Sequence, residues 1–163
     1  MKNIHKRELL KENGEKMKQK KKNPLLIAAE IIMVILTAVY SAAMVCLAGA
    51  GLIYNGESYG KNIVNTGILL IISGILLTIG AILCLFRRRI FLILSAIFTI
   101  IGLALCLSML YILCSHADSA GWTDNYTMTA VSHMYKSRIL PVIAPALLAL
   151  GIGTIKLYHS IKY

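Results

Sequence analysis

Glu30 is the one carboxylate that falls inside a long apolar stretch of this 163-residue chain. It follows Leu25 by five residues, in the segment Ala28-Ala29-Glu30-Ile31-Ile32. A carboxylate in such surroundings either exchanges a proton or cation, or is neutralised by a neighbouring base. The bases that could reach it are Arg87, Arg88 and Arg89, which lie between two other apolar stretches, and Lys156, which lies near the end of the last one. We therefore expect Glu30 to form a structural ion pair with one of these bases, with a proton or cation site as the alternative.

The cysteines are the next residues that could do chemistry, but their spacing matches no redox or zinc motif. They are Cys46, Cys84, Cys106 and Cys114. We expect buried free thiols, with a bridge between Cys46 and Cys106 as the alternative and with Cys114 exposed.

A third group of candidates lies in the segment 115–138, between the last two apolar stretches: His116, Asp118, Asp124 and His133. Their spacing fits no metal-binding signature, and the chain has no nucleophile triad, phosphate loop or dinucleotide fingerprint. The sequence therefore predicts no enzyme, no metal and no cofactor.

The composition points to a different class of protein. Hydrophobic residues make up 58% of the chain and charged residues 15%, whereas soluble domains have about 45–50% and about 25%. A chain of this length cannot bury so much apolar surface in its own core. A soluble globular enzyme and a disordered chain are both excluded, which leaves an integral membrane protein.

Four apolar stretches are long enough to cross a bilayer, since about 20 residues at 1.5 Å each span the hydrocarbon core. They cover residues 25–53, 63–86, 90–114 and 139–158. In lipid an open chain must be helical to satisfy its backbone. We expect an all-α bundle of four transmembrane helices over residues 25–163, with Glu30 as its intramembrane polar site. A short helix over 125–137 should lead into the last span, where Pro145 should kink or restart the helix.

The basic residues predict the orientation. Nine precede residue 23, three form Arg87–Arg89 and two close the chain, so fourteen of the 17 share one side. The positive-inside rule places both termini in the cytoplasm and the protein in the plasma membrane. Residues 1–24 form a mostly disordered basic tail that should contact anionic lipid headgroups rather than nucleic acid. The three arginines are a topology anchor or a headgroup contact.

Small residues mark a stripe along the second stretch, in two rows with seven-residue spacing: Thr66, Ser73, Gly80 and Gly67, Gly74, Ala81. Such stripes let membrane helices approach closely. The complementary positions should be Ser95, Thr99, Gly102, Ala42, Gly49, Ala146, Ala149 and Gly153. The stripe serves packing within the bundle or, alternatively, a partner or a second copy.

The segment around Glu30 resembles the first helix of the small multidrug exporters, which also carry a glutamate there. That resemblance implies a transport site at Glu30, but it covers only residues 28–32 and does not assign the chain to that family. The sequence as a whole favours a non-catalytic accessory, regulatory or structural subunit of a membrane complex. The alternative is an oligomeric transporter or pore component that uses Glu30.

Overall fold

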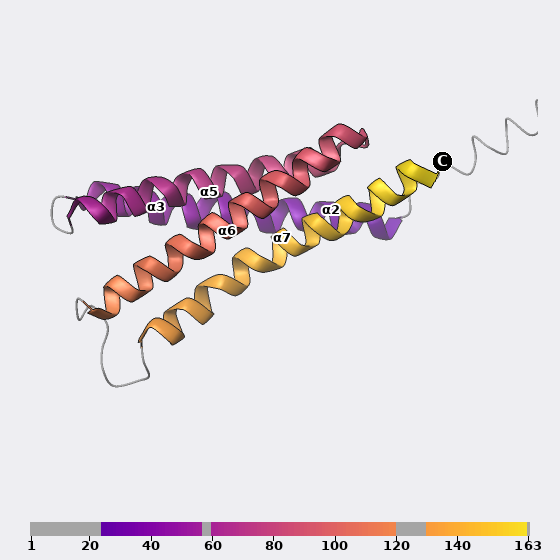
Figure 1. The fold of residues 1–163 in the computed structure, drawn as a ribbon. Helices are drawn as coiled ribbons and strands as arrows, with labels where there is room; N and C mark the ends of the chain where they lie inside the picture. Colours follow the sequence, from indigo (N-terminus) through magenta and orange to yellow (C-terminus); the bar gives the residue numbers. More distant parts are fainter. Residues whose placement is uncertain (1–23, 57–59, 120–129, 163) are drawn as a thin grey trace, which may run out of the picture.

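The computed structural model describes residues 24–56, 60–119 and 130–162, and all regular secondary structure in these ranges is helical. The elements are α2 (Pro24–Leu36), η1 (Thr37–Val45), α3 (Cys46–Tyr54), α5 (Lys61–Leu85), α6 (Arg89–Ser119) and α7 (Ala130–Lys162). α2, η1 and α3 follow one another without a break, so the elements make four rods (Figure 1). Each rod is long and apolar enough to cross a membrane, which confirms the predicted all-α class and its four long helices.

The four rods run back and forth. α5 packs against α3, η1 and α6, while α7 packs against α6 and α2. One end of the bundle, which we call the basic end, holds Pro24, Leu85, Arg89 and Lys162, where α2 begins, α5 ends, α6 begins and α7 ends (Figure 1). The connection between α5 and α6 has three residues, as expected, but it is shifted by one position to 86–88, because Phe86 takes an extended conformation after α5 and Arg89 already belongs to α6.

Two helices extend beyond the predicted spans, while the candidate membrane-spanning segments within them, Arg89–Ala117 and Leu140–Ile161, lie within three residues of the predicted 90–114 and 139–158. The third helix continues past residue 114 to Ser119, and the fourth begins at Ala130 and runs without interruption through Pro141 and Pro145. Pro145 neither ends nor restarts the helix. Its side chain is fully buried, and packing against neighbouring helices can hold a helix through the hydrogen bond that a proline removes. Part of the helix predicted over 125–137 lies outside the described residues.

The first rod contains a π-helix, η1, that keeps one face toward the core. Its buried residues recur every fourth position: Met33, Thr37, Ser41, Val45 and Gly49. In a plain α-helix each four-residue step overshoots a full turn by about 40°, so this row would rotate out of the core. Because a π-helical hydrogen bond spans one more residue, η1 winds more slowly and corrects the drift.

The η1 register changes one predicted contact position. Gly49 faces α5 as expected, but Ala42 is only half-buried and Ser41 takes its place in the core. The seven-residue spacing from Gly49 back to Ala42 assumed α-helical winding, which η1 does not have.

The bundle differs from a water-soluble one in its exterior, which is apolar like its core. The buried residues include hydroxyl side chains and glycines, with Ser41, Ser73, Ser95 and Thr99 almost completely buried. The outer face of α5 instead carries five exposed isoleucines: Ile68, Ile72, Ile75, Ile79 and Ile82. Large apolar side chains thus cover the outside, while small and hydroxyl-bearing residues fill much of the inside.

Candidate functional site

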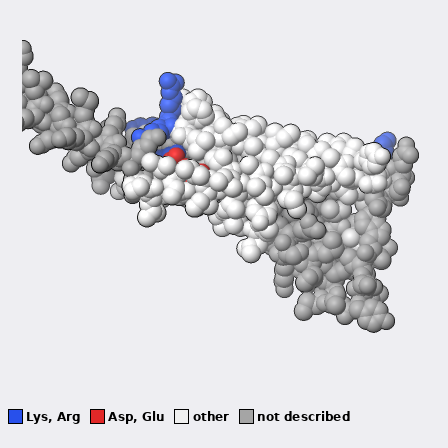
Figure 2. All heavy atoms as spheres, turned by 180° about the vertical axis from the view of Figure 1, so that it is seen from behind, with Lys and Arg blue, Asp and Glu red and all other residues white. Residues whose placement is uncertain are grey.

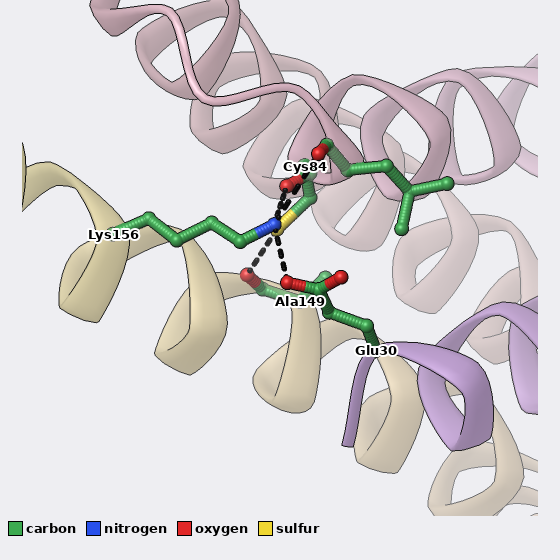
Figure 3. Close-up of polar contacts among 5 residues, drawn as sticks. Glu30, Cys84, Ala149 and Lys156 are labelled. Atoms are coloured by element: carbon green, nitrogen blue, oxygen red, sulfur yellow. Dashed lines mark hydrogen bonds and ion pairs between the residues drawn. The ribbon is translucent and has the colours of Figure 1, made fainter. Parts of the chain in front are cut away.

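Glu30 and Lys156 meet at the basic end of the bundle and form what we call the ionic cluster, together with the carbonyl groups of Cys84 and Leu85 (Figure 3). The Lys156 Nζ lies 2.8 Å from the Glu30 Oε1. It also donates hydrogen bonds to the carbonyl oxygens of Cys84, at 2.6 Å, and of Leu85, at 3.5 Å. The cluster joins three helices, α2, α5 and α7.

The ionic cluster lies inside the bundle and not on its rim. Glu30 is six residues from the start of α2, about 9 Å along the helix axis, and Lys156 is six residues from the end of α7. The Lys156 side chain is 6% exposed and the Glu30 side chain 19%. A charge this deeply buried requires a partner of opposite sign. Of the four bases that the sequence offered to Glu30, the structure pairs it with Lys156.

Lys156 has a second role that the sequence did not predict, because it caps the C-terminus of α5. The last four carbonyl groups of a helix have no partner within the helix, and Cys84 and Leu85 contribute two of them. A lysine there both donates to the carbonyls and opposes the negative end of the helix dipole. The three N–H groups of the ammonium have three acceptors. Nothing near residue 85 in the sequence marks Lys156, 71 residues away, as this cap.

Cys84 connects the same two helices a second time. Its thiol donates to the carbonyl oxygen of Ala149 at 3.3 Å (Figure 3). All four cysteines are free. Cys114 was expected to be exposed but is buried, because α6 continues beyond it and packs its last turns against the bundle.

The three arginines of the connection differ from one another. The Arg89 Nε donates to the Ser160 hydroxyl at 3.1 Å, and another N–H of the same guanidinium donates to the Ser160 carbonyl, which ties α6 to the end of α7. Arg87 and Arg88 are exposed, and within the described part of the chain no ion pair involves them. Figure 2 shows basic atoms projecting from this end, beside acidic atoms, while much of the described surface shown is uncharged.

The small-residue stripe of α5 is used within the chain. Its six residues are all buried. A Cβ on Gly67 would lie 2.7 Å from the carbonyl oxygen of Gly49, so α5 and α3 are in backbone contact there. Further along, the Ser95 hydroxyl of α6 donates to the carbonyl of Gly80 at 2.6 Å. Within the chain, α3 and η1 contact one part of the stripe and α6 contacts another.

The described residues form no metal site around the other candidates that the sequence offered. Two hollows, of about 410 and 40 Å³, lie along α6, and neither is lined by Glu30 or Lys156. Among the described residues no three His, Cys, Asp or Glu side chains converge as a metal site would need. The side chains of Asp118, Asp124 and His133 lie outside the described residues, as does the basic tail over 1–23.

Comparison with known proteins adds no identification: no family model, curated protein or solved structure matches the chain. The arrangement described above is therefore the basis for assigning a function.

Proposed function

We propose that the chain is a small multi-pass protein of the cell membrane that acts as a non-catalytic accessory, regulatory or structural subunit of a larger membrane complex. Its four rods insert as transmembrane helices, with both termini in the cytoplasm. The apolar exterior of the bundle supports insertion, since exposed isoleucines are stable in lipid and costly in water. The distribution of basic residues supports the orientation.

The observation that supports the non-catalytic role is that the charged groups of the ionic cluster already have partners within the protein. Every N–H of the Lys156 ammonium has an acceptor, and the Glu30 carboxylate is held by that ammonium. A transport site would need a carboxylate that is free to exchange its ion along an open path. Here the carboxylate instead ties α2 to α7, which supports a structural role ahead of transport.

Membrane insertion and orientation can be tested with two cysteine variants in a background without native cysteines. Asn55→Cys is exposed at the end of α3, and Arg88→Cys is exposed at the basic end. We expect a membrane-impermeant maleimide to label intact cells at Asn55→Cys and to label Arg88→Cys only after permeabilisation. The reverse pattern would refute the orientation, and release of the chain by alkaline carbonate would refute insertion.

The accessory role can be tested by chemical crosslinking in membranes, followed by purification in a mild detergent. We expect the chain to co-purify with a specific membrane protein at a fixed ratio. The wild type and Glu30→Gln can also be reconstituted in liposomes and assayed for proton flux. Flux that the wild type supports and Glu30→Gln abolishes would favour transport, and a chain that purifies only as a monomer would contradict the accessory role.

A further inference from the structure

The exposed pair Arg87 and Arg88 at the basic end carries positive charge that the described protein does not balance. Within the part of the chain whose side chains are described, Glu30 is the only carboxylate, and Lys156 neutralises it at 2.8 Å. Arg89 donates to Ser160. Arg87 and Arg88 therefore differ from Lys156 and Arg89, which already have acceptors inside the protein.

The connection that carries this arginine pair is short and ordered. Only residues 86–88 separate α5 from α6. The carbonyl of Arg88, the residue just before α6, accepts a hydrogen bond from the backbone N–H of Leu92 at 3.1 Å, which joins Arg88 to the first turn of α6. The two guanidinium groups thus project from a connection whose backbone is fixed on both sides, which favours a defined anion contact over diffuse attraction.

Apolar side chains flank the same pair. Phe86 is 49% exposed and Ile90 is 71% exposed, on the two sides of Arg87 and Arg88. The ring of Phe86 is held against Phe91, with the ring centroids 5.2 Å apart. A phosphate-binding group with exposed apolar surface on both sides fits an amphiphile better than a free inorganic anion, because both parts of the ligand find a matching surface.

We propose that Arg87 and Arg88 bind the phosphate of an anionic phospholipid whose acyl chain lies along Phe86 and Ile90. The phosphate accepts hydrogen bonds from the two guanidinium groups, and the acyl chain covers apolar surface that the bundle leaves exposed. This proposal rests on membrane insertion, since the lipid comes from the leaflet at the basic end. It assigns Arg89 a different function, that of tying α6 to α7.

The proposal can be tested on the full chain in dodecylmaltoside micelles, by native mass spectrometry with added phosphatidylglycerol or phosphatidylcholine. We expect the wild type to retain phosphatidylglycerol preferentially. Arg87→Gln should weaken its retention about fivefold, the effect of one basic group at an anionic lipid surface, and Arg87→Gln/Arg88→Gln should weaken it further. Lys61→Gln removes one exposed charge at the opposite end and should change retention less than twofold.

Three results would overturn the proposal. Equal losses from Lys61→Gln and Arg87→Gln would show general charge attraction, and no loss from the double arginine variant would exclude the pair. The third is binding of inorganic phosphate or glycerol phosphate that is as strong as binding of the lipid, which would show that the ligand is a free phosphate.

Phe86→Ser should weaken lipid retention and leave any binding of glycerol phosphate unchanged. Circular dichroism of each variant verifies its helix content. Because these measurements use micelles, they can fail while the membrane topology holds, and the topology can fail while they succeed.

Discussion

The Lys156 ammonium lies 2.8 Å from the Glu30 carboxylate and also donates to the carbonyl groups that end α5. One side chain thus neutralises a buried acid and caps a helix, so that α2, α5 and α7 are joined at one point. Glu30 and Lys156 are 126 positions apart in the chain. Their contact fixes the first rod against the last.

Removing either charge of this pair should destabilise the bundle strongly. Breaking a buried ion pair costs about 3–5 kcal/mol. Because Glu30 keeps 19% exposure, we expect Glu30→Leu or Lys156→Met to lower the free energy of unfolding by about 2–4 kcal/mol. The measurement is titration of the micellar protein with dodecyl sulfate, followed by circular dichroism.

The double variant Glu30→Leu/Lys156→Met should recover much of this loss, because no charge remains buried without a partner. Lys61→Met, which removes an exposed lysine at the other end, should change stability by less than about 0.5 kcal/mol. If the losses of the two single variants simply add in the double variant, the ion pair does not couple α2 to α7.

The contact between Gly49 and Gly67 should tolerate no larger residue. A Cβ on Gly49 would lie 2.5 Å from the carbonyl oxygen of Gly67, which is backbone and cannot move aside. We expect Gly49→Ala to lower stability by about 1–3 kcal/mol through overpacking. Gly51 lies on the same helix with no atom within 4 Å of its Cβ position, so Gly51→Ala should be neutral or stabilise by about 0.5–1 kcal/mol. Equal effects of the two substitutions in the same dodecyl sulfate titration would show that α3 and α5 are not in backbone contact.

Much of this architecture could be predicted from the sequence because it depends on local patterns. Length and apolarity identified the four long helices, and the seven-residue spacing of small residues selected six positions of α5 that the structure buries. Glu30 could be singled out because it is the one acid in an apolar stretch. These signals reflect free-energy costs that arise within a single segment, such as unsatisfied backbone groups or a buried charge.

The rest depends on how distant segments meet, which local patterns do not encode. Lys156 was a candidate partner for Glu30, but its capping of α5 requires the end of one helix to lie beside the side of another. The change from Ala42 to Ser41 as the contact residue required η1, since seven-residue spacing presumes α-helical winding. The four-residue recurrence of Thr37, Ser41, Val45 and Gly49 was visible in the sequence, and it is the signal that could have indicated slower winding.

The register imposed by η1 can be tested by enlarging neighbouring small residues. Ser41 is almost completely buried, and its carbonyl oxygen lies 2.7 Å from the Cβ position of Gly74, whereas Ala43 is exposed. We expect Ser41→Leu to lower the free energy of unfolding by about 1–3 kcal/mol and Ala43→Leu to change it by less than about 0.5 kcal/mol. The dodecyl sulfate titration measures both. A larger loss for Ala43→Leu would mean that another face of the first rod is turned to the core.

Two hydroxyl groups between α5 and α6 should respond differently to removal. The Ser95 hydroxyl donates to the carbonyl of Gly80 at 2.6 Å, and hydrogen bonds between membrane helices contribute about 0.6 kcal/mol on average. Thr99 is 1% exposed, and its hydroxyl has no partner among the described residues. We expect Ser95→Ala to destabilise by about 0.6 kcal/mol, whereas Thr99→Val, which keeps the shape of the side chain, should be neutral or stabilising. Unfolding in dodecyl sulfate measures both changes. A loss above about 1 kcal/mol for Thr99→Val would show that its hydroxyl does bind a group in the core, such as a buried water.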